Sequence, residues 1–170
     1  MPPPASVDRV RAALLAAGHP DSITEFPAGT RTAADAAAAV GCTVAQIAKS
    51  IVFRAGERAV VVITSGANRV DAKKVAAALG TAVKSADADF VRATTGFAIG
   101  GVAPVGHLTP PLLLFDRDLL ALHPIWAAAG SPSHVFPTEA ETLVRMTGAA
   151  VADVRQEEWP GAEVPNIASR

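Results

Sequence analysis

The chain has 170 residues, half of them hydrophobic and 18% charged, with a net charge of −1. This length fits one domain, and the composition is too apolar for a disordered protein, yet no run of about 20 apolar residues could span a bilayer. With the single cysteine Cys42 the chain forms no internal disulfide, and its N-terminus lacks the pattern of a secretion signal. We therefore expect a cytoplasmic protein with no membrane partner.

Helix signals dominate the first fifty residues. Apolar spacing predicts a first helix that begins after Ser6 and ends at Gly18. Capping boxes, in which a threonine and the side chain three residues later bind each other's backbone, occur twice. They predict a second helix over residues 32–40 and a short helical turn over residues 43–49.

Runs of β-branched residues follow the helices. Residues 50–53 and 58–64 are separated by a turn at residues 55–57, a pattern typical of a hairpin. The second run is apolar on both faces, so we expect a central strand. Further elements are predicted in the order helix 71–79, strand 82–84, helix 87–93, strand 111–115, a helix that begins at another capping-box pattern, Thr138 with Glu141, and ends at Gly148, and strand 150–154.

The order of these elements lacks the regular βαβ alternation of a doubly wound sheet. We predict an α+β fold in which one domain, residues 1–155, contains a mixed, barrel-like β-sheet surrounded by helices. Residues 156–170 are polar and interrupted by prolines, and we expect them to form a poorly ordered tail.

Positive charge is concentrated in the middle of the chain. Eight basic and four acidic residues lie between Lys49 and Arg92, so this segment carries +4 and the rest of the chain −5. Such a segment forms either a surface that attracts phosphates or an ordinary solvated surface.

Common catalytic and cofactor motifs are missing from the sequence. There is no P-loop, no dinucleotide-binding fingerprint and no GxSxG elbow, and Cys42 and the four histidines lack metal-ligand spacing. We therefore expect no cofactor and no metal. Two features remain: Lys49 beside an apolar run, and a glycine-rich segment, residues 95–107. For Lys49 the alternative is a stem that extends its ammonium group into water.

Three stretches follow one another along the chain: AQIAKSIVF (residues 45–53), VDAKKVAAALG (residues 70–80) and TGFAIGGVAPVG (residues 95–106). In this order they resemble the YbaK-type aminoacyl-tRNA deacylases, relatives of the editing domain in bacterial prolyl-tRNA synthetases. The resemblance extends from about residue 32 to residue 154. It implies hydrolysis of a mischarged tRNA, with tRNA for proline carrying a small wrong amino acid as the expected substrate. The partners implied are the aminoacyl-tRNA acceptor end and, as a further candidate, prolyl-tRNA synthetase.

The resemblance also implies roles for particular residues. It places the family's lysine at Lys49, which would orient the terminal phosphate or ribose, and the family's GxxxP loop at residues 100–104. Glycine lets backbone N–H groups approach the charge that develops on the ester carbonyl, so Gly100 and Gly101 are the expected catalytic glycines. Pro104 would stiffen this loop. Water would attack with help from the substrate's free ribose hydroxyl, as is proposed for the family.

Other residues are candidates for binding the substrate. Phe26 lies where some relatives carry tyrosine, and His134 lies near the position of an aspartate in some relatives. Ser50, Thr95 and Ser131 are candidates for the pocket wall. A surface location for His134 and local turn roles for the hydroxyl groups are the alternatives.

Two other functions fit the same residues. One is a nucleic-acid-binding or regulatory module without catalysis, which would bind phosphates with strong salt dependence. The other is an esterase or amidase for small molecules on the same scaffold, which would act on a free aminoacyl ester as well as on the tRNA-linked one.

Overall fold

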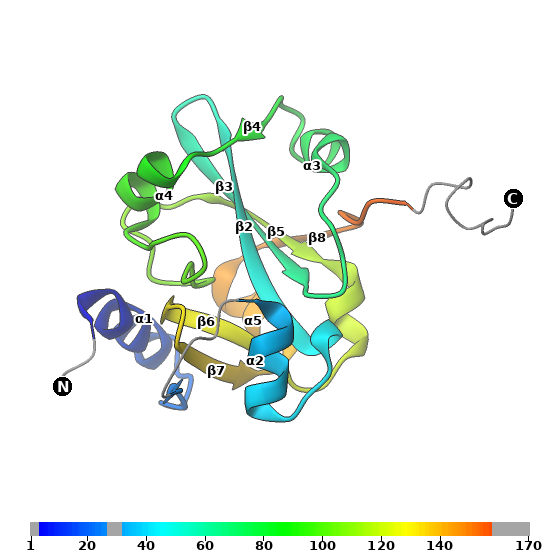
Figure 1. Ribbon diagram of the computed structural model, residues 1–170. Helices are drawn as coiled ribbons and strands as arrows, with labels where there is room; N and C mark the ends of the chain where they lie inside the picture. Colours follow the sequence, from blue (N-terminus) through cyan, green and yellow to red (C-terminus); the bar gives the residue numbers. More distant parts are fainter. Residues whose placement is uncertain (1–3, 27–31, 158–170) are drawn as a thin grey trace, which may run out of the picture.

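Two long paired strands, β2 (Ile47–Ala55) and β3 (Arg58–Ser65), form the centre of this computed structural model, which describes residues 4–26 and 32–157 (Figure 1). The other strands of this part of the chain are β1 (Thr24–Glu25), β4 (Lys84–Ser85), β5 (Leu112–Asp116), β6 (Ile125–Ser131), β7 (His134–Thr138) and β8 (Ala150–Ala152). They form one mixed sheet in the order β1-β7-β6-β2-β3-β5-β8, with β4 paired to β2.

The helices pack around this sheet. They are α1 (Ala5–Ala16), α2 (Ala33–Val40), α3 (Ala72–Leu79), α4 (Ala88–Thr95) and α5 (Ala140–Thr147), with short 3-10 helices at Val44–Gln46 and Arg117–Ala121. Helix α1 lies against β6, and α3 and α4 lie beside the β2–β3 hairpin (Figure 1). The predicted α+β class with a mixed sheet is confirmed. None of the helices in the described residues is long and apolar enough to cross a membrane.

Local sequence signals explain several element ends. The predicted capping box at the start of α2 is confirmed: the Asp35 N–H donates to the Thr32 hydroxyl at 3.1 Å, and the Thr32 N–H donates to the Asp35 carboxylate at 3.3 Å. Asp71 caps α3 through the N–H groups of Lys73 and Lys74. The hairpin and the central place of β3 are confirmed too, since every β3 residue after Arg58 is buried.

The predicted helical turn over residues 43–49 is too long. The 3-10 helix ends at Gln46, and β2 begins at Ile47. The Ile47 carbonyl accepts the Gly66 N–H at 2.7 Å on one edge of β2, and Ile47 pairs with β6 on the other edge. Pairing on both edges therefore overrides the local helical signal. As a result, Lys49 lies within a strand and not at a helix end.

Two predictions near residue 138 differ from the structure. The hairpin of β6 and β7 is absent from the predicted elements. A capping box at Thr138 was expected for α5, but the helix has Glu139 as its N-cap, without a side-chain cap. The Thr138 hydroxyl instead binds Nε2 of the buried His19 at 3.0 Å. A tertiary hydrogen bond thus takes the group that the local motif needs.

Strand β2 pairs with β3 along one edge, and the middle of its other edge is unpaired. Strand β6 pairs with Ile47 and Ala48, β4 pairs with Phe53 and Arg54, and no described strand pairs with residues 49–52 on this edge. The Ile47 carbonyl accepts a hydrogen bond on the β3 side. Because successive residues of an antiparallel strand point their backbone N–H and C=O groups to alternate edges, those of Ser50 point to the edge away from β3. We call residues 49–52 the open edge of β2.

The core lies on both faces of the central hairpin. Val61 and Ile63 belong to the main cluster, whose largest side chains are Phe97, Phe115 and Phe136, whereas Val60 and Val62 pack with α3 through Val75. The buried Asp116 joins the ends of β3 and β5, because its carboxylate accepts hydrogen bonds from the Thr64 hydroxyl, the Ser65 N–H and the Asn68 amide. This carboxylate is thereby paired within the fold.

The last described residues of the chain contact the rest of the domain. The Gln156 N–H donates to the Arg69 carbonyl at 2.8 Å, and Lys74 forms an ion pair with Glu157 at 2.6 Å. These two residues belong to the expected tail of residues 156–170. The remainder of that expected tail lies outside the described residues.

Candidate functional site

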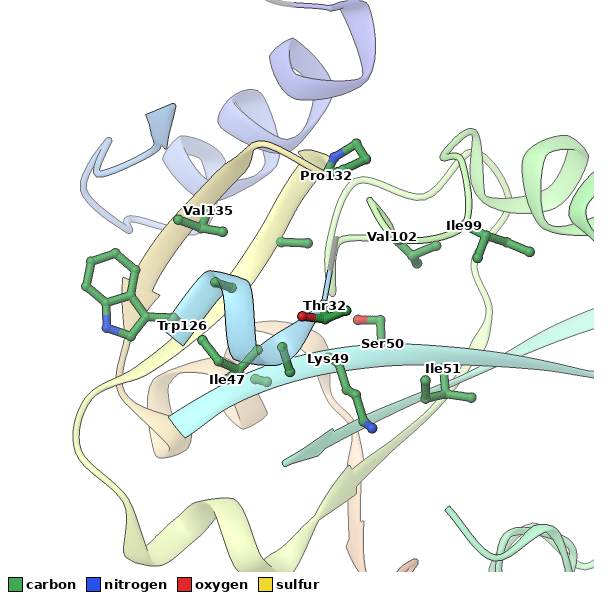
Figure 2. A pocket seen from close by; sticks show the side chains of 15 residues that line it. Thr32, Ile47, Lys49, Ser50, Ile51, Ile99, Val102, Trp126, Pro132 and Val135 are labelled. Carbon is green, nitrogen blue, oxygen red and sulfur yellow. The ribbon is translucent and has the colours of Figure 1, made fainter. Parts of the chain in front are cut away.

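A pocket of about 260 Å³ opens beside the open edge of β2 (Figure 2). Its walls come from the start of α2, from β2, from the glycine-rich segment and from the β6–β7 hairpin. The volume is small among ligand pockets, which span about 300–1,000 Å³. The lining is mainly apolar and includes Ala36, Ile47, Val102, Trp126, Ala128 and Val135. A pocket of this size and character suits a small, largely apolar group.

Lys49 and Ser50 both line this pocket but leave β2 on opposite sides, as neighbouring strand residues must (Figure 2). Ser50 faces the interior, on the side of Thr32. The Ser50 hydroxyl is buried and has no hydrogen-bond partner among the described residues, whereas the Thr32 hydroxyl accepts the Asp35 N–H. Ser50 therefore offers the interior a hydroxyl that no described residue binds.

The side chain of Lys49 also lines the pocket, but its ammonium group points away from the interior, on the other side of β2 from Ser50 (Figure 2). The side chain is half-buried, and within residues 4–26 and 32–157 it forms no ion pair or hydrogen bond. Burial lowers the pKa of Lys49, and the positive charge of Arg69 lowers it further. An incompletely hydrated cation without a protein anion is suited to an anionic ligand such as a phosphate.

The two glycines predicted to act together have different positions. Gly100 is exposed, lines the pocket, and its N–H has no acceptor among the described residues. Gly101 is buried, and its N–H donates to the Ala98 carbonyl at 3.0 Å. A Cβ on Gly101 would lie 2.8 Å from the Ser131 Cα, so glycine is required there by close packing. In this arrangement only Gly100 offers its N–H to a ligand.

Thr95 and Pro104 lie behind the pocket. Thr95 is fully buried; its hydroxyl donates to the Val91 carbonyl at 2.6 Å and accepts the Phe97 N–H at 3.1 Å. It ends α4, and Gly96 follows with φ of 80°. Pro104 is also buried and does not line the pocket. The structure thus does not bring Thr95 to the place proposed for substrate.

Ser131 and His134 form a pair at the β6–β7 turn. The Ser131 hydroxyl and His134 Nδ1 are 2.5 Å apart, and His134 Nε2 lies 3.9 Å from a Glu25 carboxylate oxygen. His134 is 5% exposed, so the alternative of a surface histidine is wrong. Neither residue lines the pocket, although their neighbours Pro132 and Val135 do.

Phe26 lies on the outer side of the same hairpin. Its N–H donates to the Ser133 carbonyl at 2.9 Å, and its side chain is not part of the pocket wall. Sequence reasoning missed Thr32, Val102 and Trp126 as lining residues. Thr32 carries a signal, the capping box, but that signal predicts a helix start and says nothing of a pocket.

Comparisons with known proteins agree on one family. The model of the aminoacyl-tRNA editing domain matches residues 27–146. The uncharacterized protein YwhH of Bacillus subtilis (strain 168) is 29% identical over 127 residues, which cover 74% of this chain and 81% of that protein.

Two solved structures are similar over most of the chain. A crystal structure described as a proposed trans-editing enzyme for prolyl-tRNA synthetase is 43% identical, with a TM-score of 0.87 over 92% of this chain and 100% of that chain. The hypothetical protein APE2540 is 29% identical, with a TM-score of 0.81 over 87% of this chain and 99% of its own. The chain therefore belongs to the aminoacyl-tRNA editing domain family, as its resemblance to the YbaK-type deacylases predicts.

Proposed function

We propose that this protein hydrolyses the ester of mischarged aminoacyl-tRNA, releasing the amino acid from the acceptor end. The observation that carries this proposal is a small, apolar pocket whose lining includes a lysine without an ion pair among the described residues, in a chain of the editing-domain family. The similar structure described as a proposed trans-editing enzyme supports tRNA for proline as the carrier. Prolyl-tRNA synthetase is the protein partner that we propose.

The geometry supports a separate role for each part of the site. The amino-acid side chain occupies the apolar interior, and Lys49 binds the phosphate or ribose of the terminal nucleotide outside it. The Gly100 N–H stabilises the negative charge that develops on the ester carbonyl oxygen. Water, assisted by the free ribose hydroxyl, attacks the carbonyl carbon, and the bond to the other ribose oxygen breaks. The amino acid and the free tRNA are the products.

Deacylation of a panel of tRNAs tests this proposal. Wild-type protein should accelerate hydrolysis of alanyl-, cysteinyl- or seryl-tRNA for proline above the enzyme-free rate and spare correctly charged prolyl-tRNA. One added methylene changes binding in a pocket by about 1–3 kcal/mol, so rates should differ by roughly 10- to 200-fold across the panel. Binding of tRNA without faster hydrolysis of any member would contradict the proposal and favour the non-catalytic module.

A small-molecule esterase is the second candidate, and the Ser131–His134 contact favours it. A serine next to a histidine is the pairing that covalent ester hydrolysis requires. The pair lacks an orienting hydrogen bond, however, since Glu25 is 3.9 Å from His134 Nε2. The Ser131 hydroxyl also accepts the Ser133 N–H at 3.1 Å, as in a local turn. A free aminoacyl ester in the panel separates the two: the esterase hydrolyses it as fast as the tRNA-linked ester.

Replacing Ser50 by alanine should weaken substrate recognition without weakening the fold. A neutral hydrogen bond contributes about 0.5–1.5 kcal/mol, so kcat/KM should fall roughly 2- to 10-fold. The melting temperature should stay equal or rise, because a buried hydroxyl without a partner is removed.

Ser22 provides the matched control for this substitution. Its hydroxyl is also buried without a partner among the described residues, but it lies outside the pocket. Ser22→Ala should therefore leave the deacylation rate unchanged. Equal rates for wild type and Ser50→Ala on every tRNA of the panel would remove Ser50 from the site.

A further inference from the structure

Helix α1 holds the glycine-rich segment through one side chain. Arg9 donates from Nε to the Gly106 carbonyl at 3.1 Å and from Nη2 to the Gly96 carbonyl at 3.0 Å. The same guanidinium lies 4.9 Å from the centre of the Phe97 ring. A single planar group thus joins two carbonyls that are ten residues apart, one at each end of the stretch that includes Gly100.

The same helix also touches the opposite wall of the pocket. The Ser6 hydroxyl donates to the Gly130 carbonyl on β6 at 2.7 Å. A Cβ on Gly130 would lie 2.7 Å from the Ser6 carbonyl oxygen, so the helix and the strand are in direct backbone contact. Next along the chain, the backbone of Ser131 contacts Gly101. Helix α1, the β6–β7 hairpin and the glycine-rich segment therefore form one packed unit.

The glycine-rich segment needs such support. Gly96, Gly100 and Gly106 all have positive φ, a conformation that glycine adopts freely in the unfolded chain and that costs entropy to fix. Besides the Arg9 contacts, backbone hydrogen bonds hold the two ends of the segment together: the Leu108 and Thr109 N–H groups, just after it, donate to carbonyls at the end of α4. These bonds fix where the segment leaves the helix. They do not connect the segment to the other wall of the pocket.

We infer that Arg9 is a positioning residue for deacylation: it fixes the glycine-rich segment so that the Gly100 N–H faces the ester. This inference rests on the proposed function. Arg9 lies outside residues 27–146, which the editing-domain model matches, so a helix beyond that region orients a catalytic loop within it. A lysine cannot replace it, because an ammonium group has no planar fork to span two carbonyls.

Kinetics of Arg9→Gln and Arg9→Lys test the inference. In both variants kcat should fall about 10- to 100-fold, the effect expected when a loop that positions reacting groups shifts by about 1 Å. KM for the tRNA should change less than about threefold, since Lys49 and the pocket walls are intact. Rates are measured at a temperature where each variant is fully folded. A lower melting temperature with wild-type kcat would show a merely structural role and overturn the inference.

Arg11→Gln is the matched control on the same helix. Arg11 is the next arginine along α1, but it pairs with Asp8 and Asp21 and, within the described part of the chain, forms no hydrogen bond or ion pair with the pocket walls. Its exposed ion pairs contribute little to stability, so kcat and the melting temperature should both match wild type. A loss of kcat equal to that of Arg9→Gln would show a general effect of the helix charge and contradict a specific role for Arg9.

Hydrogen exchange tests the positioning contact of Arg9 independently of the proposed deacylase function. If the wild-type protein hydrolyses no tRNA of the panel, the proposed function fails, but the positioning contact is still measurable. Backbone amides of residues 97–106 should exchange at least about tenfold faster in Arg9→Gln than in wild type. In Arg11→Gln they should exchange at the wild-type rate. Equal exchange in all three proteins would show that Arg9 does not hold the segment.

Discussion

Lys49→Met should lower the deacylation rate by about 10²- to 10³-fold, the loss expected when one group that binds developing or substrate charge is removed. Methionine keeps most of the apolar stem and removes the ammonium group. Because Lys49 has no ion pair within the described residues and is half-buried, the melting temperature should not fall. Single-turnover rates on mischarged tRNA and a thermal melt measure the two effects.

The matched control is Lys73→Met on α3. Lys73 is exposed and lies outside the pocket, so this variant removes the same charge from the chain without touching the site. Its rate should stay within about twofold of wild type after correction for weaker general attraction of tRNA. Normal turnover by Lys49→Met would refute the assignment of Lys49.

The pH profile provides a second measurement on Lys49. Its pKa is lowered by burial and by Arg69, so the charged form that binds phosphate is lost at a pH below the ordinary lysine value of about 10.4. The enzymatic rate, corrected for spontaneous ester hydrolysis, should therefore fall as pH rises through that lowered pKa. Arg69→Gln removes one cause of the shift, raises the pKa of Lys49 and should move this fall to higher pH. An unmoved profile would mean that another group titrates.

Gly101→Ala is the second substitution with a large expected effect. The added Cβ would lie 2.8 Å from the Ser131 Cα and 3.1 Å from the Pro132 nitrogen, both backbone atoms that cannot turn away. The glycine-rich segment must then separate from the β6–β7 turn, and a displacement of about 1 Å lowers kcat about 100-fold. Such overpacking destabilises a fold by about 1–3 kcal/mol.

Gly56→Ala separates stability from positioning in this comparison. Gly56 has φ of 62° at the β2–β3 turn, and a Cβ there meets open space. A left-handed alanine costs about 1–2 kcal/mol, similar to the loss at Gly101, but Gly56 is not part of the pocket lining. Kinetics and melts of both variants should show equal destabilisation and a lower rate only for Gly101→Ala. A wild-type rate in Gly101→Ala would show that the contact is dispensable.

Local chemistry was enough to predict many elements of the fold. The capping box of Thr32 and Asp35, the Asp71 cap and the β-branched run of β3 each encode their structure within a few residues. The β6–β7 hairpin lacks such a signal, because its inner strand is rich in alanine and glycine, which have low β-propensity. Helix α1 explains that composition: Gly130 lies in backbone contact with Ser6, and Ala129 is fully buried.

The candidate site was predictable only in part. Lys49 and the glycine-rich segment were assigned by resemblance to a family. The sequence does not show that the Gly101 N–H donates to the Ala98 carbonyl, which distinguishes this glycine from Gly100. Ser50 was a candidate for the pocket wall, and it does line the pocket, but the sequence does not reveal that its hydroxyl has no partner among the described residues. The Arg9 contacts have no sequence signal at all. They depend on which atoms the fold brings together, and the Arg9 partners are 87 and 97 residues away.

The open edge of β2 has a consequence for how substrate range can change in this fold. Strand β6 leaves β2 after Ala48, and β4 joins β2 only at Phe53, so the pocket occupies a fork in the sheet. The β6–β7 hairpin is one arm of that fork, and β2 with its long pairing to β3 is the other. A small rotation of the hairpin would widen or narrow the fork without breaking the pairing that carries Lys49. We therefore expect selectivity for the amino acid to diverge through the angle between two strands, with Lys49 held in place by the pairing of β2 with β3 and the glycine-rich segment moving with the hairpin that it packs against.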